Sequence, residues 1–172
     1  MSIRSVAAAH MPTIRLAAIT DHDAIWSILE PVIRSGNTYM YAPNATREEM
    51  LAIWFMPGKF TYVAELEGQL VGTFYLVANQ PGLGAHVANA GYMVHPDYRG
   101  SGIAQEMCRF SLEEARRLGF YAMQFNAVVS TNIVAVKLWE RLGFTIIGTV
   151  PKAYQHQTLG LVDTYVMYQW LS

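Results

Sequence analysis

The pattern of apolar and polar positions along the first half of the chain predicts a strand, two helices and three further strands. The first strand is expected over 13–18, and an amphipathic helix capped by Asp21 continues to residue 33. Thr46 and Glu49 have the spacing of a capping box, so a second helix is expected to begin there. Extended segments follow at 61–66, 70–78 and 87–94, and Glu67-Gly68 has the length of a tight hairpin turn between the first two.

The second half of the chain alternates helices with strands. A glycine-rich turn at 99–102 opens a helix that should end at Gly119. A strand at 122–128, a helix at 132–142, and strands at 144–150 and 162–170 complete the chain. The order βααβββαβαββ predicts an α/β fold in which about seven strands form a mixed central sheet flanked by about four helices.

Composition narrows the possible functions. The chain has 172 residues, of which 52% are apolar and 15% charged, and its formal net charge is −1. These values predict one folded domain over 13–172 after a loose extension over 1–12, with no basic surface for nucleic acid or an anionic membrane. The single cysteine, Cys108, allows neither an internal disulfide nor a multi-cysteine metal site. His10, His22, His86 and His95 lack metal-ligand spacing, so we expect no metal, no membrane segment and a cytoplasmic location.

The most informative segment is the turn between the strand that ends at Val94 and the following helix. Two glycines, Gly100 and Gly102, let successive backbone N–H groups face one concavity at a helix N-terminus, which is a favourable place for a phosphate. The Gly-Lys-Ser/Thr of a P-loop is absent, and Gln105 stands where a dinucleotide fingerprint needs its third glycine. An ordinary strand-to-helix turn with Arg99 as a surface charge is the alternative interpretation.

Two motifs in this order resemble the GNAT superfamily of N-acetyltransferases. Arg99, Gly102 and Ala104 match its Arg/Gln-x-x-Gly-x-Gly/Ala motif, which follows a strand that ends in Val-x-Pro. A later motif of that family, Asn-x-x-Ala-x-x-Leu-Tyr-x-x-x-Gly-Phe, is matched by the residues Asn132, Ala135, Leu138, Gly143 and Phe144. The resemblance spans about residues 13–170 and implies the GNAT fold with acetyl-CoA as the acyl donor.

The resemblance also implies which residues bind the cofactor. The turn would hold the pyrophosphate through its backbone amides, and the main chain at the end of the preceding strand would hold the pantetheine arm. Asn132 would contact the pantetheine as well as cap its helix, and Trp139 would lie beside the thiol or belong to the core alone. The cofactor-binding set is therefore Met93, Val94, His95, Arg99, Gly100, Ser101, Gly102, Ile103, Ala104, Asn132 and Trp139.

The chain departs from the family where a proton donor is usual. Trp139 takes the place of the frequent tyrosine general acid, and an indole N–H does not release a proton at neutral pH. The strand at 86–94 contains no Asp or Glu that would act as a general base. A water relay, or capture of an amine that is already neutral, is the expected route.

Three asparagines suggest the substrate. The segments at 87–94 and 124–132 resemble the proline-analogue (azetidine-2-carboxylate) acetyltransferases, with phosphinothricin acetyltransferases as a second close resemblance. That similarity implies that Asn89, Asn126 and Asn132 surround the reacting centre, with Asn89 on the substrate carboxylate and Asn126 and Asn132 in catalytic positions. Alternation puts Asn89 on one strand face, and on the next strand Asn126 is expected to share a face with Gln124 and Val128.

An amide-lined pocket suits a small, amino-acid-like amine as substrate. Tyr39 and His156, in loops after the first helix and before the last strand, are candidate walls of this pocket. A non-catalytic acyl-CoA sensor, and an acetyltransferase acting on protein N-termini or lysines, are the competing functions. Aromatic and Met-rich segments at 39–41 and 165–170 favour a homodimer, although core packing explains them nearly as well.

Overall fold

The computed structural model describes residues 11–171, and most of the extension expected over 1–12 lies outside this range. Its α-helices and strands follow the expected order, so the α/β prediction is confirmed. The bounds are β1 Thr13–Leu16, α1 His22–Arg34, α2 Arg47–Trp54, β2 Phe60–Leu66, β3 Gln69–Ala78, β4 Val87–Val94, α3 Ile103–Arg117, β5 Ala122–Val129, α4 Ile133–Arg141, β6 Thr145–His156 and β7 Gly160–Trp170.

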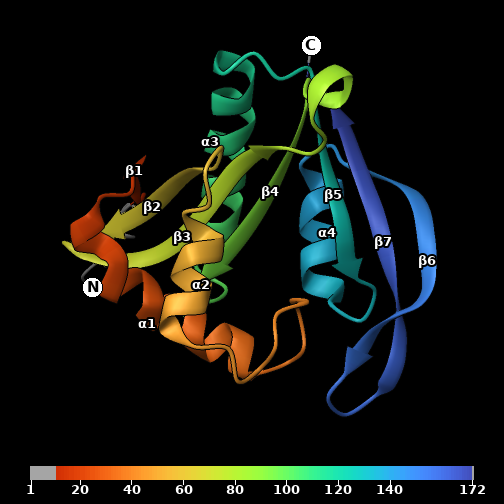
Figure 1. Ribbon diagram of the computed structural model, residues 1–172, viewed down its shortest axis with the longest axis horizontal. Helices are drawn as coiled ribbons and strands as arrows, with labels where there is room; N and C mark the ends of the chain where they lie inside the picture. Colours follow the sequence, from red (N-terminus) through yellow and green to blue (C-terminus); the bar gives the residue numbers. More distant parts are fainter. Residues whose placement is uncertain (1–10, 172) are drawn as a thin grey trace, which may run out of the picture.

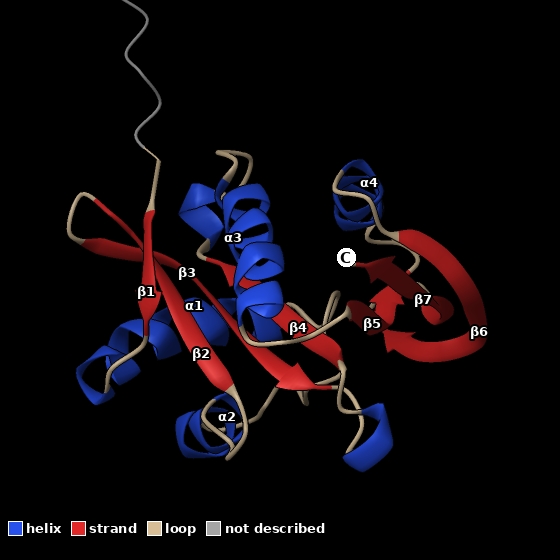
Figure 2. Cartoon of the chain, turned by 90° about the horizontal axis from the view of Figure 1, so that it is seen from above, coloured by secondary structure: helices blue, strands red, loops and turns tan. Residues whose placement is uncertain are grey.

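The seven strands form one sheet in the order β1-β2-β3-β4-β5-β7-β6, in which only β4 and β5 run parallel. Helices α1 and α2 cover one face, while α3 and α4 cover the other (Figure 2). Each face has its own apolar core. Trp54 and Val63 belong to the core under α1 and α2, whereas Phe74, Met107 and Phe144 belong to the core under α3 and α4.

Local signals at helix and hairpin boundaries are confirmed in most places. Thr46 Oγ1 accepts a hydrogen bond from the Glu49 N–H at 3.2 Å, and the Glu49 carboxylate accepts one from the Thr46 N–H at 2.8 Å, which completes the capping box. Glu67 and Gly68 have φ values of 52° and 79°, as a two-residue type I′ turn requires. Asp21 is the N-cap residue of α1 as expected, but its side chain does not cap the helix, because its carboxylate accepts instead from the Ala18 N–H and from Arg15, both at 2.7 Å.

The last hairpin is longer than the sequence pattern indicated. Strand β6 continues to His156 instead of ending near residue 150, and β7 already begins at Gly160. The pairing of β6 with β7 shifts between Val150 and Tyr154, around Pro151, which has no N–H to donate to the ladder. An edge strand tolerates this irregularity, so the hairpin extends beyond the apolar alternation that marked the strand in the sequence.

The parallel strands β4 and β5 separate soon after they begin. Their pairing is confined to Val87 with Ala122 and Ala88 with Met123, after which they diverge. Figure 1 shows the two strands side by side near the C-terminus and apart at their other ends, with the loop between α1 and α2 reaching toward the opening. We call this opening the splay; it exposes main-chain groups that a continuous sheet would pair.

Candidate active site

The glycine-rich turn before α3 presents backbone N–H groups that no side chain covers. Gly100 and Gly102 have φ values of 77° and 87°, and a Cβ built on either would meet no atom within 4 Å. The first N–H groups of any α-helix have no intrahelical partner. Gly102, the N-cap of α3, has no side chain that could cap them. Open space, free donors and the positive end of the helix dipole fit the pyrophosphate that the resemblance places here.

The main chain of β4 presents a second set of free groups along the splay. At the two ends of the strand, Val87 C=O accepts from the Asn79 N–H at 2.8 Å and the His95 N–H donates to Val71 C=O at 2.9 Å, so the odd-numbered residues face β3. Because these groups alternate along an antiparallel strand, the main-chain groups of Tyr92 and Val94 face the splay. Of the three residues expected to hold the pantetheine arm, Val94 is therefore the one whose main chain is directed into the opening.

Tyr39 reaches the splay from the loop between α1 and α2. Its hydroxyl accepts a hydrogen bond from the Tyr92 N–H at 2.9 Å and donates one to the Tyr92 C=O. Both main-chain groups that a strand partner would satisfy are thus paired with one side chain. The Tyr39 ring stacks on Tyr41 with ring centroids 5.8 Å apart.

The other residues expected near the cofactor lie at the start of α4, within α4, and in and directly after β4. Asn132 is the N-cap of α4, and its Oδ1 accepts from the Ala135 N–H at 3.3 Å, which leaves its amide nitrogen able to donate. Trp139 is buried in the core beneath β4, with its ring centroid 5.2 Å from that of Tyr92. Met93 is buried on the α1 and α2 face, and His95 Nδ1 accepts from the Asp97 N–H at 3.3 Å.

A chain of amide side chains lies on the α1 and α2 face of the sheet. The Gln124 amide donates to Asn126 Oδ1 at 2.9 Å, and the Asn126 amide donates to Asn79 Oδ1 at 2.7 Å. Asn89, half-buried on β4, shares this face, because the neighbouring Gly91 packs against the Tyr75 ring of the core under α1 and α2. The structure thus brings Asn89 and Asn126 to the same side of neighbouring strands.

One expectation for Asn126 is wrong. Asn126 does not share a face with Val128, and its side chain is exposed. The pairing of β5 with β7 shifts between Phe125, which pairs with Met167, and Val128, which pairs with Tyr165. The strand β5 therefore has one more residue than β7 between these two pairs. This bulge turns Phe125 and Val128 toward the same apolar core and leaves the Asn126 side chain on the open face.

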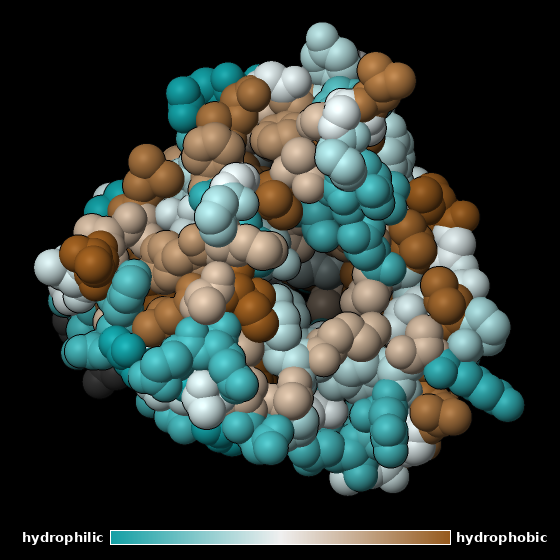
Figure 3. Space-filling view, in the orientation of Figure 1, coloured by the Kyte–Doolittle hydropathy of each residue, from teal (hydrophilic) through white to brown (hydrophobic). Residues whose placement is uncertain are grey.

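Tyr39 and His156 line one pocket, of about 400 Å³, at the end of the splay. The loop between α1 and α2 forms one wall, and the β6–β7 hairpin forms the other; its lining residues are Gly36, Tyr39, Met40, Tyr41, Ala42, Pro43, Tyr154, Gln155, His156 and Gln157. The Tyr154 hydroxyl donates to Tyr39 C=O at 3.2 Å and joins the two walls. Seen from the side of α1 and α2, the molecule is hollowed near the middle of its surface (Figure 3).

The lining of this pocket contains no Asp, Glu, Lys or Arg. Burial raises the pKa values of Tyr39, Tyr41 and Tyr154 above the ordinary tyrosine value, so their hydroxyls stay protonated at neutral pH. His156 Nδ1 accepts from the N–H groups of Thr158 and Leu159 at 3.2 and 3.3 Å, so the neutral ring carries its proton on Nε2. The pocket therefore presents hydrogen-bond donors and aromatic faces and lacks a fixed charge.

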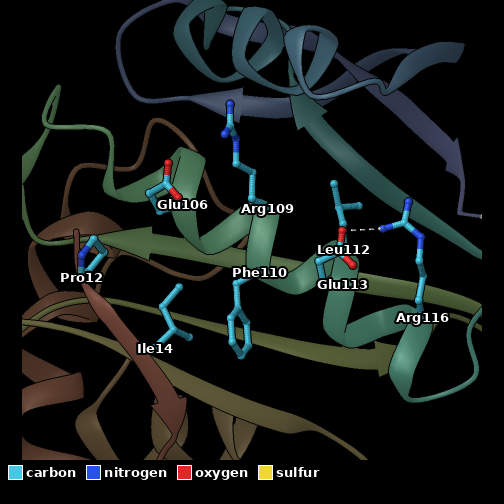
Figure 4. Close-up of a pocket in the computed structure, with 8 residues that line it drawn as sticks. All are labelled: Pro12, Ile14, Glu106, Arg109, Phe110, Leu112, Glu113 and Arg116. Carbon is cyan, nitrogen blue, oxygen red and sulfur yellow. Dashed lines mark hydrogen bonds and ion pairs between the residues drawn. The ribbon is translucent and has the colours of Figure 1, made fainter.

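A second pocket, of about 510 Å³, lies between β1 and α3 (Figure 4). Its apolar floor contains Ile14 and Phe110, and charged side chains such as Arg109 and Glu113 form its rim. None of the residues expected to bind cofactor or substrate lines this pocket. Within residues 11–171 no three His, Cys, Asp or Glu side chains are grouped to hold a metal ion, and no helix is long and apolar enough to cross a membrane.

The sequence did not identify Asn79 and Tyr154 as parts of the site. Asn79 directly follows β3 in a segment with Pro and Gly, which has the signature of a loop. Its contact with Asn126 joins residues 47 positions apart and depends on the packing of three strands. Tyr154 lies in the part of β6 that extends beyond the predicted strand.

Known proteins share the fold and much of the sequence of this chain. Residues 24–144 match the model of the acetyltransferase (GNAT) family. The N-acetyltransferase aca1 of Schizosaccharomyces pombe is 38% identical over 157 residues, which cover 80% of this chain and 74% of that protein. A GCN5-related N-acetyltransferase from Kribbella flavida superposes with a TM-score of 0.90 at 41% identity, covering 95% of this chain and 100% of the other.

A phosphinothricin acetyltransferase from Sinorhizobium meliloti, whose structure is a complex with AcCoA, has a TM-score of 0.83 at 22% identity and covers 94% of this chain and 89% of its own; it shares the fold. The family match covers more than half of the chain, and the relatives at about 40% identity cover most of it. The chain belongs to the GNAT acetyltransferase family and is an N-acetyltransferase with the GNAT fold.

Proposed function

We propose that this enzyme transfers the acetyl group of acetyl-CoA to the amine of a small, amino-acid-like substrate. Two observations support the proposal. Gln124, Asn126 and Asn79 form a chain of amides on the sheet face that Asn89 shares. The pocket lined by Tyr39 and His156, which none of these amides lines, contains no fixed charge. Amide N–H groups donate to a carboxylate without the cost of burying a cation beside it. A polyamine would instead require carboxylates, which the pocket lining lacks.

The cofactor supplies an acyl group that is already activated as a thioester, and the chain contributes binding and orientation. The turn at 99–104 binds the pyrophosphate, and the main chain of Val94 with the amide of Asn132 orients the arm. Asn89 binds the substrate carboxylate, and Asn126, fixed between Gln124 and Asn79, orients the amine. The pocket hydroxyls are protonated and do not accept a proton, so the amine reacts in its neutral form.

The decisive experiment measures release of free thiol from acetyl-CoA with matched pairs of amines. Azetidine-2-carboxylate, phosphinothricin and methionine sulfoximine are each compared with the corresponding carboxamide. The carboxylates are expected to react and the carboxamides to react at least about tenfold more slowly, since the carboxylate is the group that the amides recognise. Equal rates within the pairs, or turnover with peptide N-termini alone, would refute the small-substrate assignment.

Variants locate the substrate on the sheet. Asn89→Ala is expected to raise KM for the amine at least about fivefold, through loss of about 1 kcal/mol or more of hydrogen bonding, with Kd for CoA unchanged. Asn44→Ala, in an exposed part of the α1–α2 loop outside the pocket lining, is the matched control and should behave as the wild type. Unchanged kinetics in Asn89→Ala would remove Asn89 from the substrate site.

We also propose a homodimer formed through the sheet edge at β6. This strand is the outermost in the sheet, and its Ile146, Ile147 and Val150 side chains are exposed. Light scattering after size exclusion should give twice the chain mass, and Ile147→Lys should shift it to the monomer. A monomeric wild type at micromolar concentration would contradict the dimer.

A further inference from the structure

We propose that the Tyr39 hydroxyl occupies the place on β4 where the acyl end of the cofactor binds. The hydroxyl pairs with the Tyr92 main chain in the free enzyme and is displaced when the acyl end of the cofactor arrives. The proposal rests on the function above in taking β4 as the track of the cofactor arm and the pocket lined by Tyr39 and His156 as the amine site. It assigns Tyr39 a positioning role that differs from that of a passive pocket wall.

Free main-chain groups are regularly spaced along β4. Val94 and Tyr92 are two residues apart and both face the splay, so their donors are separated by roughly 6.6 Å along the strand. An arm that starts at the pyrophosphate turn and follows β4 reaches Val94 first and Tyr92 next. The reactive end of the arm, which lies farthest from the pyrophosphate, therefore comes to Tyr92.

The main-chain groups of Tyr92 already have a partner. The Tyr39 hydroxyl holds both the N–H and the C=O of Tyr92, in the way a neighbouring strand would. A group of the arm that takes the Tyr92 N–H has to displace this hydroxyl. In the free enzyme the hydroxyl satisfies two polar groups that would otherwise be unpaired at the edge of the core.

Movement of Tyr39 also affects the amine pocket. Tyr39 lines the pocket between the α1–α2 loop and the β6–β7 hairpin, and Tyr154 anchors the Tyr39 C=O from the hairpin. Displacement of the Tyr39 side chain changes the wall of that pocket. Arrival of the acyl arm thus reshapes the amine pocket, and the expected order of binding is acetyl-CoA before amine.

The test measures ligand affinity by calorimetry, without turnover. Tyr39→Phe removes the competing hydroxyl and leaves the Tyr92 groups unpaired in the free enzyme, so acetyl-CoA is expected to bind about tenfold more tightly. Adenosine 3′,5′-bisphosphate, which contains only the nucleotide end, should bind to both enzymes equally. Tyr41→Phe is the matched control, because its ring stacks on Tyr39 but its hydroxyl makes no bond to Tyr92, and its affinity for acetyl-CoA should be unchanged.

Other outcomes overturn the proposal. Equal or weaker binding of acetyl-CoA by Tyr39→Phe contradicts competition, and an equal change for both ligands indicates a general structural effect. If Tyr39→Phe does not fold, Tyr154→Phe, which releases the anchor of the same loop, must strengthen acetyl-CoA binding in the same direction. Failure of the wild type to bind acetyl-CoA would contradict the proposed function. An affinity for acetyl-CoA that is the same in the wild type, Tyr39→Phe and Tyr154→Phe would overturn this inference alone.

Discussion

Replacement of Gly102 by alanine separates the cost of backbone strain from the loss of a phosphate site. Gly102 has a φ of 87° and is the N-cap of α3, where an added Cβ would meet no atom of the chain within 4 Å. The variant therefore suffers strain without a clash, and a non-glycine residue in this region costs about 1–2 kcal/mol. For a chain of this size that corresponds to a loss of about 2–8 °C in Tm.

The same helix offers a matched control at its other end. Gly119 has a φ of 89°, and an added Cβ there would also meet nothing within 4 Å. Gly119→Ala should therefore lower Tm by about the same amount as Gly102→Ala. Gly119 follows the C-terminal end of α3, away from the turn, so its replacement should leave the affinity for CoA unchanged.

The affinity for CoA is where the two variants should differ. A pyrophosphate bound to the backbone at 100–104 approaches the space that the new Cβ of Gly102→Ala would fill. Hydrogen bonds to a charged group contribute about 1.5–3 kcal/mol each, so the loss of one reduces affinity about tenfold or more. Titration calorimetry with CoA and thermal melting of the ligand-free proteins give the two quantities. Equal CoA affinities for the two variants would refute the assignment of the turn to the pyrophosphate.

Three further predictions concern stability. Thr46→Ala removes the cap of α2 and should cost about 1 kcal/mol by urea unfolding; an unchanged midpoint would contradict its capping role. Phe144→Ala, at a buried ring that stacks on Phe125 with centroids 4.3 Å apart, should cost about 3–5 kcal/mol, whereas Phe60→Ala, at a ring that is 42% exposed, should cost far less. Hydrogen bonds from Arg117 and Tyr62 lower the pKa of Glu114 to about 2. The stabilising contribution of the carboxylate is therefore complete above about pH 4.5 and is lost as the pH falls toward 2. The difference in unfolding free energy between the wild type and Glu114→Gln should vanish over that range.

Features specified by neighbouring residues could be predicted from the sequence. The Thr46 capping box, the Asn132 cap and the Glu67-Gly68 turn each depend on a few consecutive residues and local hydrogen bonds. The turn at 99–102 is of the same kind, because positive φ at Gly100 and Gly102 is a local requirement. Asp21 is the exception among the caps, since Arg15, on β1, takes its carboxylate.

Features that depend on strand partners could not be predicted in the same way. The bulge at Asn126 and Ala127 is defined by the register of β5 against β7, and it reverses the side on which Val128 lies. The amide contact between Asn79 and Asn126 depends on the same packing. The candidate substrate residues were thus identified by type and position, while their exposure and partners followed from the sheet.

The departure at Trp139 and the position of Tyr39 have one explanation in the fold. The indole of Trp139 fills the core beneath β4 and packs on the rings of Tyr92 and Phe125, so α4 has no hydroxyl to offer at this point of the splay. The Tyr39 hydroxyl reaches the same residue, Tyr92, from the opposite side of the sheet. Tyr39 belongs to a loop that lines the pocket facing the β6–β7 hairpin, so the hydroxyl at this strand comes from the α1 and α2 side of the sheet instead of from α4. Tyr39 and Trp139 are therefore related through Tyr92, and this relation depends on the pairing of β4, which leaves the Tyr92 main-chain groups without a strand partner.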